Sequence, residues 1–319
     1  MAKKNVIVVS LGNSGSGAVF DYLRSRKDMY TPFYGEEFRL FNDPQGIYSL
    51  YLNLYKNPGN NIYSFFFDEF EKYFKSLNRI KKNKNEKKIS IFDKAFFKKT
   101  ENYLKKIIYL EFNALPQFKR IQLNFLDKVN YLRHSKIMKK SINEHKYFKV
   151  RLPIVEKKFI IETKKYLHKI TYKKNNQNVL LNQSINVLNI KEHQKFFSNC
   201  KVVVVTRDPR SIFSSMKSRN SFAFPGKDVK IFINWYQDLF KKLKTQKKMN
   251  NTLIIKYENF LENFDQEKKR LCKFININTR MNSGFNVNSS KKNLYKAKKI
   301  LTTKELKLIE KNLKSYLQW

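Results

Sequence analysis

An apolar strand, a glycine-rich turn and a helix follow one another at the start of the chain and leave few folds open. Residues 4–10 are rich in β-branched side chains and end at a glycine turn, which predicts a strand buried on both faces. From Gly17 onward the apolar residues fall on one helical stripe. A strand, a loop and a helix in this order are typical of the first unit of a parallel α/β sheet.

The loop Gly12-Asn-Ser-Gly-Ser-Gly17 has the glycine spacing of a Walker A phosphate-binding loop, G-x-x-x-x-G-K-[ST]. Ala18 stands where the lysine belongs and Val19 where a Ser/Thr would hold magnesium, so the parts that neutralise a γ-phosphate are missing. Backbone N–H groups at a helix N-terminus can still hold a phosphate. A dinucleotide-binding fingerprint fits less well, because Phe20 stands at its third glycine. The loop therefore predicts a phosphate site that uses no metal.

The rest of the chain alternates strand and helix patterns around a different central region. Extended segments are expected at residues 29–41, 148–152, 179–181, 201–206 and 252–257. Three helices are also expected: one that begins near Ser211, one that follows the segment 252–257 and runs through Phe274, and one over residues 304–317. Residues from about 45 to 146 are helical, aromatic and basic in pattern. We therefore predict one α/β domain over residues 1–319, with three layers, a central parallel sheet, the topology of P-loop nucleotide kinases and a helical insertion at about 45–146.

Within that region, apolar side chains recur at steps of four and three residues, which favours a helix face packed in a core over an aromatic ligand platform. The stripe consists of Phe66, Phe70, Tyr73, Leu77 and Ile80. The run from Lys81 to Lys88 is expected to be a solvated linker.

The composition is strongly basic, with 66 Lys+Arg against 26 Asp+Glu and a formal net charge of +40. Such a charge suggests a polyanionic partner, but an A/T-rich genome would give the same excess of lysine, and both explanations stay open. The cysteines Cys200 and Cys272 have no Cys-x-x-Cys neighbour, which argues against a disulfide framework or a zinc site. Since the sequence has neither a signal-peptide pattern nor an apolar run of about 20 residues, a cytoplasmic protein is expected.

A second motif, Val202-Val-Val-Val-Thr-Arg-Asp-Pro-Arg-Ser-Ile-Phe-Ser-Ser215, joins a buried strand to a helix. Together with the glycine loop it resembles the sulfotransferase family, which transfers a sulfuryl group from 3′-phosphoadenosine 5′-phosphosulfate (PAPS). In that family a loop such as PKSGTTW holds the 5′-phosphosulfate, and an RDPRD-x-x-x-S pattern binds the 3′-phosphate. The resemblance implies that Arg207 and Ser215 bind the 3′-phosphate. It assigns the 5′-phosphosulfate to Asn13, Ser14, Gly15, Ser16, Gly17 and Ala18.

One position of the loop departs from the family pattern. Asn13 stands where the family usually carries a lysine or arginine that assists the leaving group. Loop N–H groups alone, or a lysine from elsewhere in the chain, would have to supply that stabilisation.

Two later segments extend the resemblance. Leu253–Phe260 is similar to the family's late strand with its Tyr-Glu-Asp/Asn pattern, and Leu301–Leu306 is similar to a part of the final helix. Ser289-Ser-Lys-Lys-Asn293 corresponds to the family's late basic loop, which implies that Lys291 and Lys292 contact the nucleotide.

The general base is expected near the second extended segment. Gly35-Glu-Glu-Phe-Arg-Leu-Phe41 resembles the Lys-Glu-x-x-Phe-Phe stretch of carbohydrate sulfotransferases, which makes Glu37 the base and puts Glu36 at the family's lysine. Adjacent residues of a strand point to opposite faces, so one carboxylate of the pair should enter the site; a surface pair on a loop is the alternative.

A competing alignment is weaker. Phe148–Pro153 resembles a Lys-Thr-His-Leu-Pro stretch with a histidine base, but Arg151 stands at that histidine and cannot give up its proton. This favours Glu37 and a sugar acceptor. The histidines occur without motif neighbours and are expected to be surface or helix residues: His134, His145, His168 and His193.

The sequence as a whole is identified as similar to a bacterial, PAPS-dependent carbohydrate sulfotransferase without a metal. Its expected acceptor is a glycan, such as a capsule or lipopolysaccharide precursor, with the insertion forming a wall of the acceptor site. The basic surface would dock on an anionic membrane, with no specific nucleic-acid partner. A kinase with a degenerate loop and a basic nucleic-acid-binding protein are the alternatives.

Overall fold

The computed structural model describes residues 4–57, 62–77, 80–82, 88–113, 125–132, 149–172, 177–219, 225–244, 251–281 and 283–318. The chain divides into two compact units. Unit 1 contains residues 1–38 and 171–319, and unit 2 contains residues 39–170. The predicted insertion at about 45–146 lies within unit 2.

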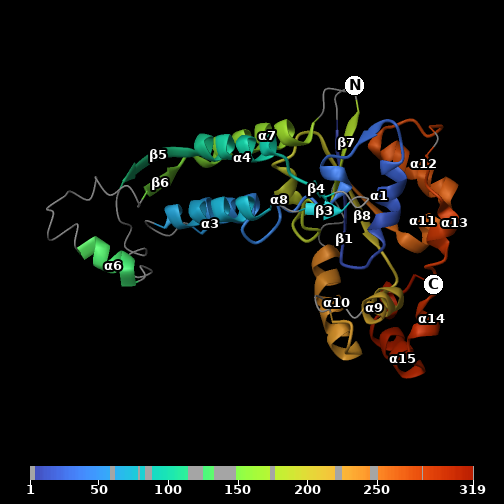
Figure 1. Cartoon of the computed structure of the whole chain (residues 1–319). Helices are drawn as coiled ribbons and strands as arrows, with labels where there is room; N and C mark the ends of the chain where they lie inside the picture. Colours follow the sequence, from blue (N-terminus) through green and yellow to red (C-terminus); the bar gives the residue numbers. More distant parts are fainter. Residues whose placement is uncertain are drawn as a thin grey trace. The chain divides into compact units, whose positions relative to one another are not determined.

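Unit 1 contains a five-stranded sheet in which every pairing is parallel (Figure 1). The strands lie in the order β2-β7-β1-β8-β9. Their bounds are Asn5–Ser10 for β1, Met29–Tyr30 for β2, Asn178–Asn182 for β7, Cys200–Thr206 for β8 and Thr252–Lys256 for β9. The predicted α/β fold with a central parallel sheet is confirmed, and the fold is that of P-loop nucleotide kinases.

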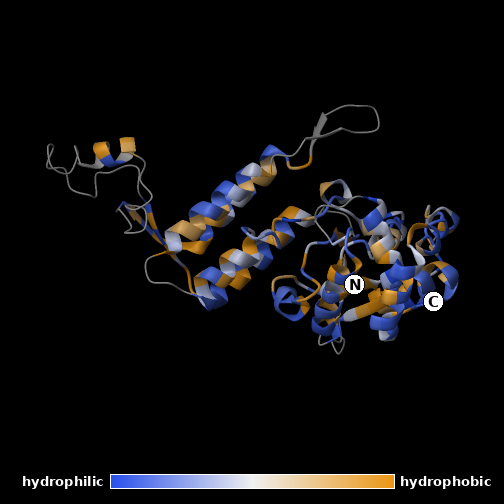
Figure 2. Cartoon of the chain, turned by 90° about the horizontal axis from the view of Figure 1, so that it is seen from below, coloured by the Kyte–Doolittle hydropathy of each residue, from blue (hydrophilic) through white to orange (hydrophobic). Residues whose placement is uncertain are grey.

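Both faces of the sheet are covered. Val6 and Val8 of β1 point into one cluster, whereas Ile7 and Val9 point to the opposite face, and all four are fully buried. Figure 2 shows the hydrophobic residues concentrated on these strands, with mixed hydropathy on the surrounding helices. This burial explains why the strands are continuous apolar runs.

The helices of unit 1 follow the strands in sequence. They are α1 (Ser16–Arg24), α8 (Ile190–Gln194), α9 (Pro209–Ser218), α10 (Val229–Lys244), α11 (Tyr257–Glu262), α12 (Phe264–Ile275), α13 (Val287–Lys291), α14 (Ala297–Ile300) and α15 (Thr303–Asn312), with 3₁₀ turns at Phe33–Gly35 and Lys314–Tyr316. The helices predicted after the glycine loop, after Pro209, through Phe274 and near the end of the chain are all present. Helices α8, α10, α13 and α14 were not predicted, and α13 contains part of the expected basic loop at 289–293.

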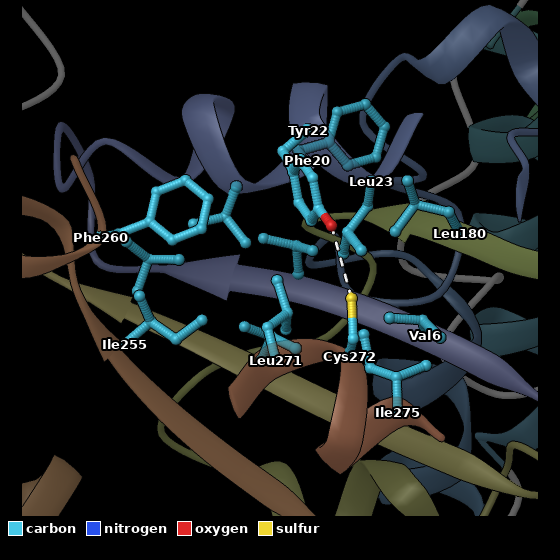
Figure 3. Packing of buried hydrophobic residues seen from close by; sticks show 14 of the residues in the cluster. Val6, Phe20, Tyr22, Leu23, Leu180, Ile255, Phe260, Leu271, Cys272 and Ile275 are labelled. Atoms are coloured by element: carbon cyan, nitrogen blue, oxygen red, sulfur yellow. Dashed lines mark hydrogen bonds between the residues drawn. The ribbon is translucent and has the colours of Figure 1, made fainter. Parts of the chain in front are cut away.

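Helices α1, α11 and α12 cover one face of the sheet and contain a buried polar centre (Figure 3). The Tyr22 hydroxyl lies 3.4 Å from the Cys272 thiol, and both residues are buried. The buried Arg26 pairs with Asp28 at 2.7 Å and donates to the Asn278 carbonyl at 2.7 Å. Arg26 thereby ties the end of α1 to the residues that follow α12.

Unit 2 contains helices and two separate antiparallel strand pairs. Its elements are α2 (Ile47–Tyr51), which continues as a π-helical turn (Leu52–Lys56), α3 (Tyr63–Ser76), β3 (Ile80–Lys82), β4 (Lys88–Ser90), α4 (Lys94–Ile107), β5 (Ile108–Asn113), α6 (Phe125–Leu132), β6 (Lys149–Pro153) and α7 (Glu156–Thr171). Strand β3 pairs with β4 and β5 with β6. Two hydroxyl pairs, Tyr103 with Thr163 and Thr100 with Tyr166, each at 2.7 Å, join α4 to α7.

Three sequence expectations were wrong in part. The extended segment 29–41 forms strand only at Met29–Tyr30 and then a 3₁₀ turn, because Pro32 and Gly35 interrupt it. The strand predicted at 148–152 is β6, which pairs antiparallel with β5 and does not join the parallel sheet. The ends of the predicted linker at 81–88 lie in β3 and β4.

The apolar stripe of α3 is rotated from its predicted position. Phe70 and Leu77 are buried as expected, but Phe67 and Phe74 take the other buried positions. Tyr73 is half-buried, since its hydroxyl donates to Asp43 at 2.6 Å. Ile80 lies in β3, outside the helix.

Candidate active site

The carboxyl ends of four parallel strands meet at one edge of the unit 1 sheet, where ligands bind in open α/β folds. The glycine loop follows β1, Gln183 follows β7, Arg207 follows β8 and Tyr257 follows β9. The backbone of Glu37 forms a parallel bridge with Asn182 at the end of β7. The structure thus brings the predicted loop, Arg207 and Glu37 to the same edge.

The glycine loop has a left-handed backbone at two positions, Asn13 (φ 62°) and Gly15 (φ 78°). Helix α1 begins at Ser16, so the N–H groups of its first turn have no carbonyl four residues earlier in the helix, and among them the Ala18 N–H donates to the Gly15 carbonyl at 3.1 Å. A Cβ at Gly15 would lie 2.3 Å from the Tyr257 ring, whereas Gly17 faces open space. The loop is therefore packed closely against Tyr257 at Gly15, and its backbone is open to a ligand at Gly17.

Gln183 supports this loop from the neighbouring strand. Its Nε2 donates to the hydroxyls of Ser10 at 3.0 Å and Ser16 at 3.1 Å, and its Oε1 accepts from the Ser10 N–H at 3.2 Å. The Ser10 hydroxyl in turn donates to the Ser16 hydroxyl at 2.9 Å, so Gln183 and Ser10 together fix the Ser16 hydroxyl at the start of α1. Sequence reasoning missed Gln183, because a glutamine after a short strand carries no motif.

Arg207 joins three segments that are far apart in the sequence. Its Nη1 donates to the Asn13 carbonyl at 3.3 Å and to the Ser215 hydroxyl at 3.1 Å, and its Nη2 donates to the Asn293 carbonyl at 2.9 Å. The side chain is buried, and Nε has no hydrogen-bond partner among the described residues. Burial lowers the pKa of Arg207, since the charged form is removed from water.

Tyr257 lies between the loop and Arg207. The Arg207 guanidinium carbon is 4.7 Å from the centre of the Tyr257 ring, which also covers Gly15, and the Tyr257 hydroxyl donates to the Ser290 carbonyl at 3.3 Å. The segment 290–293 is thus held at the site through its backbone. The side chains of Lys291 and Lys292 on this segment are exposed.

Behind Arg207 lies a buried network of charges. Asp208 caps α9 and binds Arg210 through both oxygens, and it accepts the Gln318 N–H at 2.8 Å. Glu258 accepts the Asp208 N–H at 3.2 Å and lies 3.9 Å from Arg207 Nε. Burial raises the pKa of Glu258 to about 7. The Glu258 carboxyl group is therefore the acidic neighbour of Arg207 within this buried network.

The two glutamates at the predicted base position differ in exposure. Glu37 is exposed and Glu36 is half-buried. The Asn182 side chain donates to the Gly35 carbonyl at 3.5 Å, which holds this segment along the end of β7.

Arg151, which stands at the alternative base position, and the histidines lie in other elements of the structure or outside the described residues. Arg151 binds Asp68, Glu71 and Glu111 in unit 2, at 3.4, 2.9 and 3.1 Å. The buried His193 accepts the Asn186 N–H at 3.0 Å, and burial lowers its pKa to about 3. His168 is exposed on α7, and His134 and His145 lie outside the described residues.

The described residues contain no group of three or more His, Cys, Asp or Glu side chains that could hold a metal ion. Nor do the described helices include one long and apolar enough to cross a membrane.

Comparison with known proteins identifies the family. A model of the sulfotransferase family matches residues 6–280. The chain belongs to this family: it is a PAPS-dependent sulfotransferase that acts on a hydroxyl acceptor, as the sequence predicted.

Among solved structures, the chain is similar to a sulfotransferase domain from the curacin biosynthetic pathway (12% identity, TM-score 0.45, 98% of each chain covered). It is also similar to mouse sulfotransferase SULT7A1 complexed with PAP (16% identity, TM-score 0.32), where the match covers 44% of this chain and 66% of that chain. A third is retinol dehydratase in complex with androsterone and PAP (14% identity, TM-score 0.38, 98% and 81% covered). None of the curated proteins matches the sequence. With these TM-scores the assignment rests on the family model.

Proposed function

We propose that the edge described above binds PAPS, with the loop Asn13–Ala18 on the 5′-phosphosulfate and with Arg207 and Ser215 on the 3′-phosphate. The observation that carries this proposal is the position of Arg207, a buried guanidinium that contacts the loop, α9 and the segment 290–293. Burying a cation costs free energy unless an anion accompanies it. Its planar fork matches the oxygens of a phosphate.

Three further residues at the same edge of the sheet are proposed to contribute to the nucleotide site. Gln183 orients the Ser16 hydroxyl toward the loop, and Lys291 and Lys292 are exposed on the segment that Tyr257 and Arg207 hold. We assign these two lysines to the outer side of the nucleotide, where exposed cations can still reach a phosphate.

For the transfer step we propose Glu37 as the base. The acceptor hydroxyl attacks sulfur, its proton passes to the Glu37 carboxylate, and the bond from sulfur to the bridging oxygen of the 5′-phosphate breaks. The leaving group is adenosine 3′,5′-bisphosphate (PAP), whose 5′-phosphate carries one more negative charge than it did in PAPS, and the loop N–H groups stabilise that charge. The backbone bridge from Glu37 to Asn182 supports this role, because it fixes the segment beside Gln183 and the loop.

We propose a carbohydrate hydroxyl as the acceptor, such as that of a capsule or lipopolysaccharide precursor in a bacterial cytoplasm. The support is the resemblance at residues 35–41 and the arginine at the alternative base position. The net charge of +40 supports peripheral association with an anionic membrane that carries such precursors.

Thermal stability tests the nucleotide site without knowledge of the acceptor. PAP at about 100 times its dissociation constant should stabilise the native state by about 2.7 kcal/mol. ADP should stabilise it less, and Arg207→Ala should abolish the effect of PAP. Stabilisation only by ATP with magnesium would instead favour a kinase.

A matched pair of variants tests the base. Glu37→Gln should abolish sulfuryl transfer to a carbohydrate panel while PAP still raises the melting temperature, and Glu36→Gln serves as the control for loss of one carboxylate. Loss of transfer in Glu36→Gln alone would move the base to the neighbouring residue.

A further inference from the structure

The loop of this enzyme lacks a charge at Asn13, where the family usually carries a lysine or arginine that assists the leaving group. Asn13 is neutral, and its left-handed backbone (φ 62°) suits asparagine better than most residues. Departure of PAP increases the negative charge at the 5′-phosphate, and backbone amides carry only partial positive charges. A cation from outside the loop would add a full positive charge to the stabilisation that these amides give.

Arg219 brings a guanidinium to this position. Its Nη1 donates to Asn13 Oδ1 at 3.3 Å, so the Asn13 side chain holds the cation at the loop. Arg219 is exposed and stands at the C-cap of α9, where the helix dipole favours a positive charge. A single nitrogen makes this contact, and the guanidinium has further N–H donors for a ligand.

Helix α9 connects the two ends of the proposed nucleotide site. Ser215 and Arg219 are four residues apart and lie on the same helix face. Ser215 contacts Arg207, whereas Arg219 contacts the loop. One rigid helix thus sets the spacing between the 3′-phosphate residues and Arg219.

Two guanidinium groups converge on Asn13, Arg207 at its carbonyl and Arg219 at its side chain. The two cations repel each other: burial is the main cause of the lowered pKa of Arg207, and the charge of Arg219 adds to it. An anion bound at the loop would relieve this repulsion.

We propose that Arg219 binds the 5′-phosphosulfate and supplies the leaving-group charge that a loop lysine supplies elsewhere in the family. This inference rests on the proposed nucleotide site. In the transfer step, Arg219 stabilises the electron pair that stays on the bridging oxygen when the bond to sulfur breaks, while the acceptor proton goes to the base.

Calorimetric titration of the full chain with three nucleotides distinguishes binding at the 5′-phosphate from binding at the 3′-phosphate. PAP carries both phosphates, 3′-AMP lacks the 5′-phosphate and 5′-AMP lacks the 3′-phosphate. Arg219→Gln should weaken the binding of PAP by about 10-fold or more, as expected for the loss of a hydrogen bond between charged groups. Binding of 3′-AMP should change by less than about 2-fold, because that ligand has nothing for Arg219 to contact. Arg280→Gln removes an equally exposed arginine and is the matched control.

A second variant moves the charge back into the loop. Asn13→Lys combined with Arg219→Gln should restore the preference for PAP over 3′-AMP, whereas a purely structural role of Arg219 would not be rescued. Melting temperatures of all variants check that each is folded.

The outcomes are distinct. An unchanged ratio of PAP to 3′-AMP affinity in Arg219→Gln, or equal weakening of both ligands, would overturn the role of Arg219 and leave the nucleotide site in place. If the native protein binds PAP no better than 5′-AMP, the 3′-phosphate site fails and the proposed function fails with it.

Discussion

The close approach of the Tyr257 ring to Gly15 allows a quantitative test of how the glycine loop is built. Replacing Gly15 by alanine adds a Cβ at a φ of 78° and at 2.3 Å from the ring. The left-handed backbone alone costs an alanine about 1–2 kcal/mol. The overlap adds about 1–3 kcal/mol, as in other overpacked sites. Tyr257 cannot move freely, since it is buried, stacked on Arg207 and bonded to Ser290.

A double-mutant cycle separates the two costs. In the native background, Gly15→Ala should lower the free energy of unfolding by about 2–5 kcal/mol. In a Tyr257→Ala background, where the ring is absent, it should cost only the backbone part of about 1–2 kcal/mol. The difference between the two values is the coupling between loop and ring.

Tryptophan fluorescence during urea unfolding measures the free energy of unfolding of unit 1, which contains both Gly15 and Tyr257. Both tryptophans of the chain, Trp235 and Trp319, belong to unit 1. Equal costs of Gly15→Ala in the two backgrounds would refute the steric argument, and a cost below about 1 kcal/mol in both would refute the argument from φ as well.

Three further predictions concern buried charges. Because burial raises the pKa of Glu258 from its ordinary value of 4.5 to about 7, the native protein should lose stability relative to Glu258→Gln as pH rises from about 4.5 to 7, by up to about 3 kcal/mol. Melting curves across this range measure the difference, and parallel curves for the two proteins would contradict the prediction. Arg26→Met leaves the half-buried Asp28 without its cation and the Asn278 carbonyl without its donor, and should cost about 1–3 kcal/mol in urea unfolding, against less than about 0.5 kcal/mol for the exposed Arg24→Met. Arg151→Met removes the partner of three carboxylates and should speed proteolysis within residues 39–170; an unchanged cleavage pattern would show that this cluster does not stabilise unit 2.

Local patterns predicted the parts of the site that depend on local geometry. The strand, loop and helix around Gly12–Gly17 are defined by residues that are neighbours in sequence, and the distance from Arg207 to Ser215 fits the turns of one helix. Periodicity fails where it is ambiguous. The run Phe65-Phe66-Phe67 places apolar residues on several sides of α3, and the prediction chose Phe66 and Tyr73 where the buried residues are Phe67 and Phe74, one position further along.

The remaining contacts depend on long-range packing. Gln183 reaches Ser16, 167 residues away in sequence, and no repeat or spacing marks that contact. Tyr257 was part of a recognised pattern, but its position over Gly15 follows from the order of the strands. The antiparallel pairing of β6 was missed for a related reason, because a strand's own residues do not state its direction or its partner.

The strand order also determines when the sheet can form during synthesis. β1 ends at Ser10, yet its two neighbours begin at Asn178 and Cys200. At about 5–20 residues per second, the ribosome needs on the order of ten seconds or more to supply the first of them. During that interval the residues of unit 2 emerge, while a strand of four fully buried aliphatic residues has no partner to pair with. The first strand of the proposed phosphate site therefore stays without a partner strand until more than half of the protein has been made.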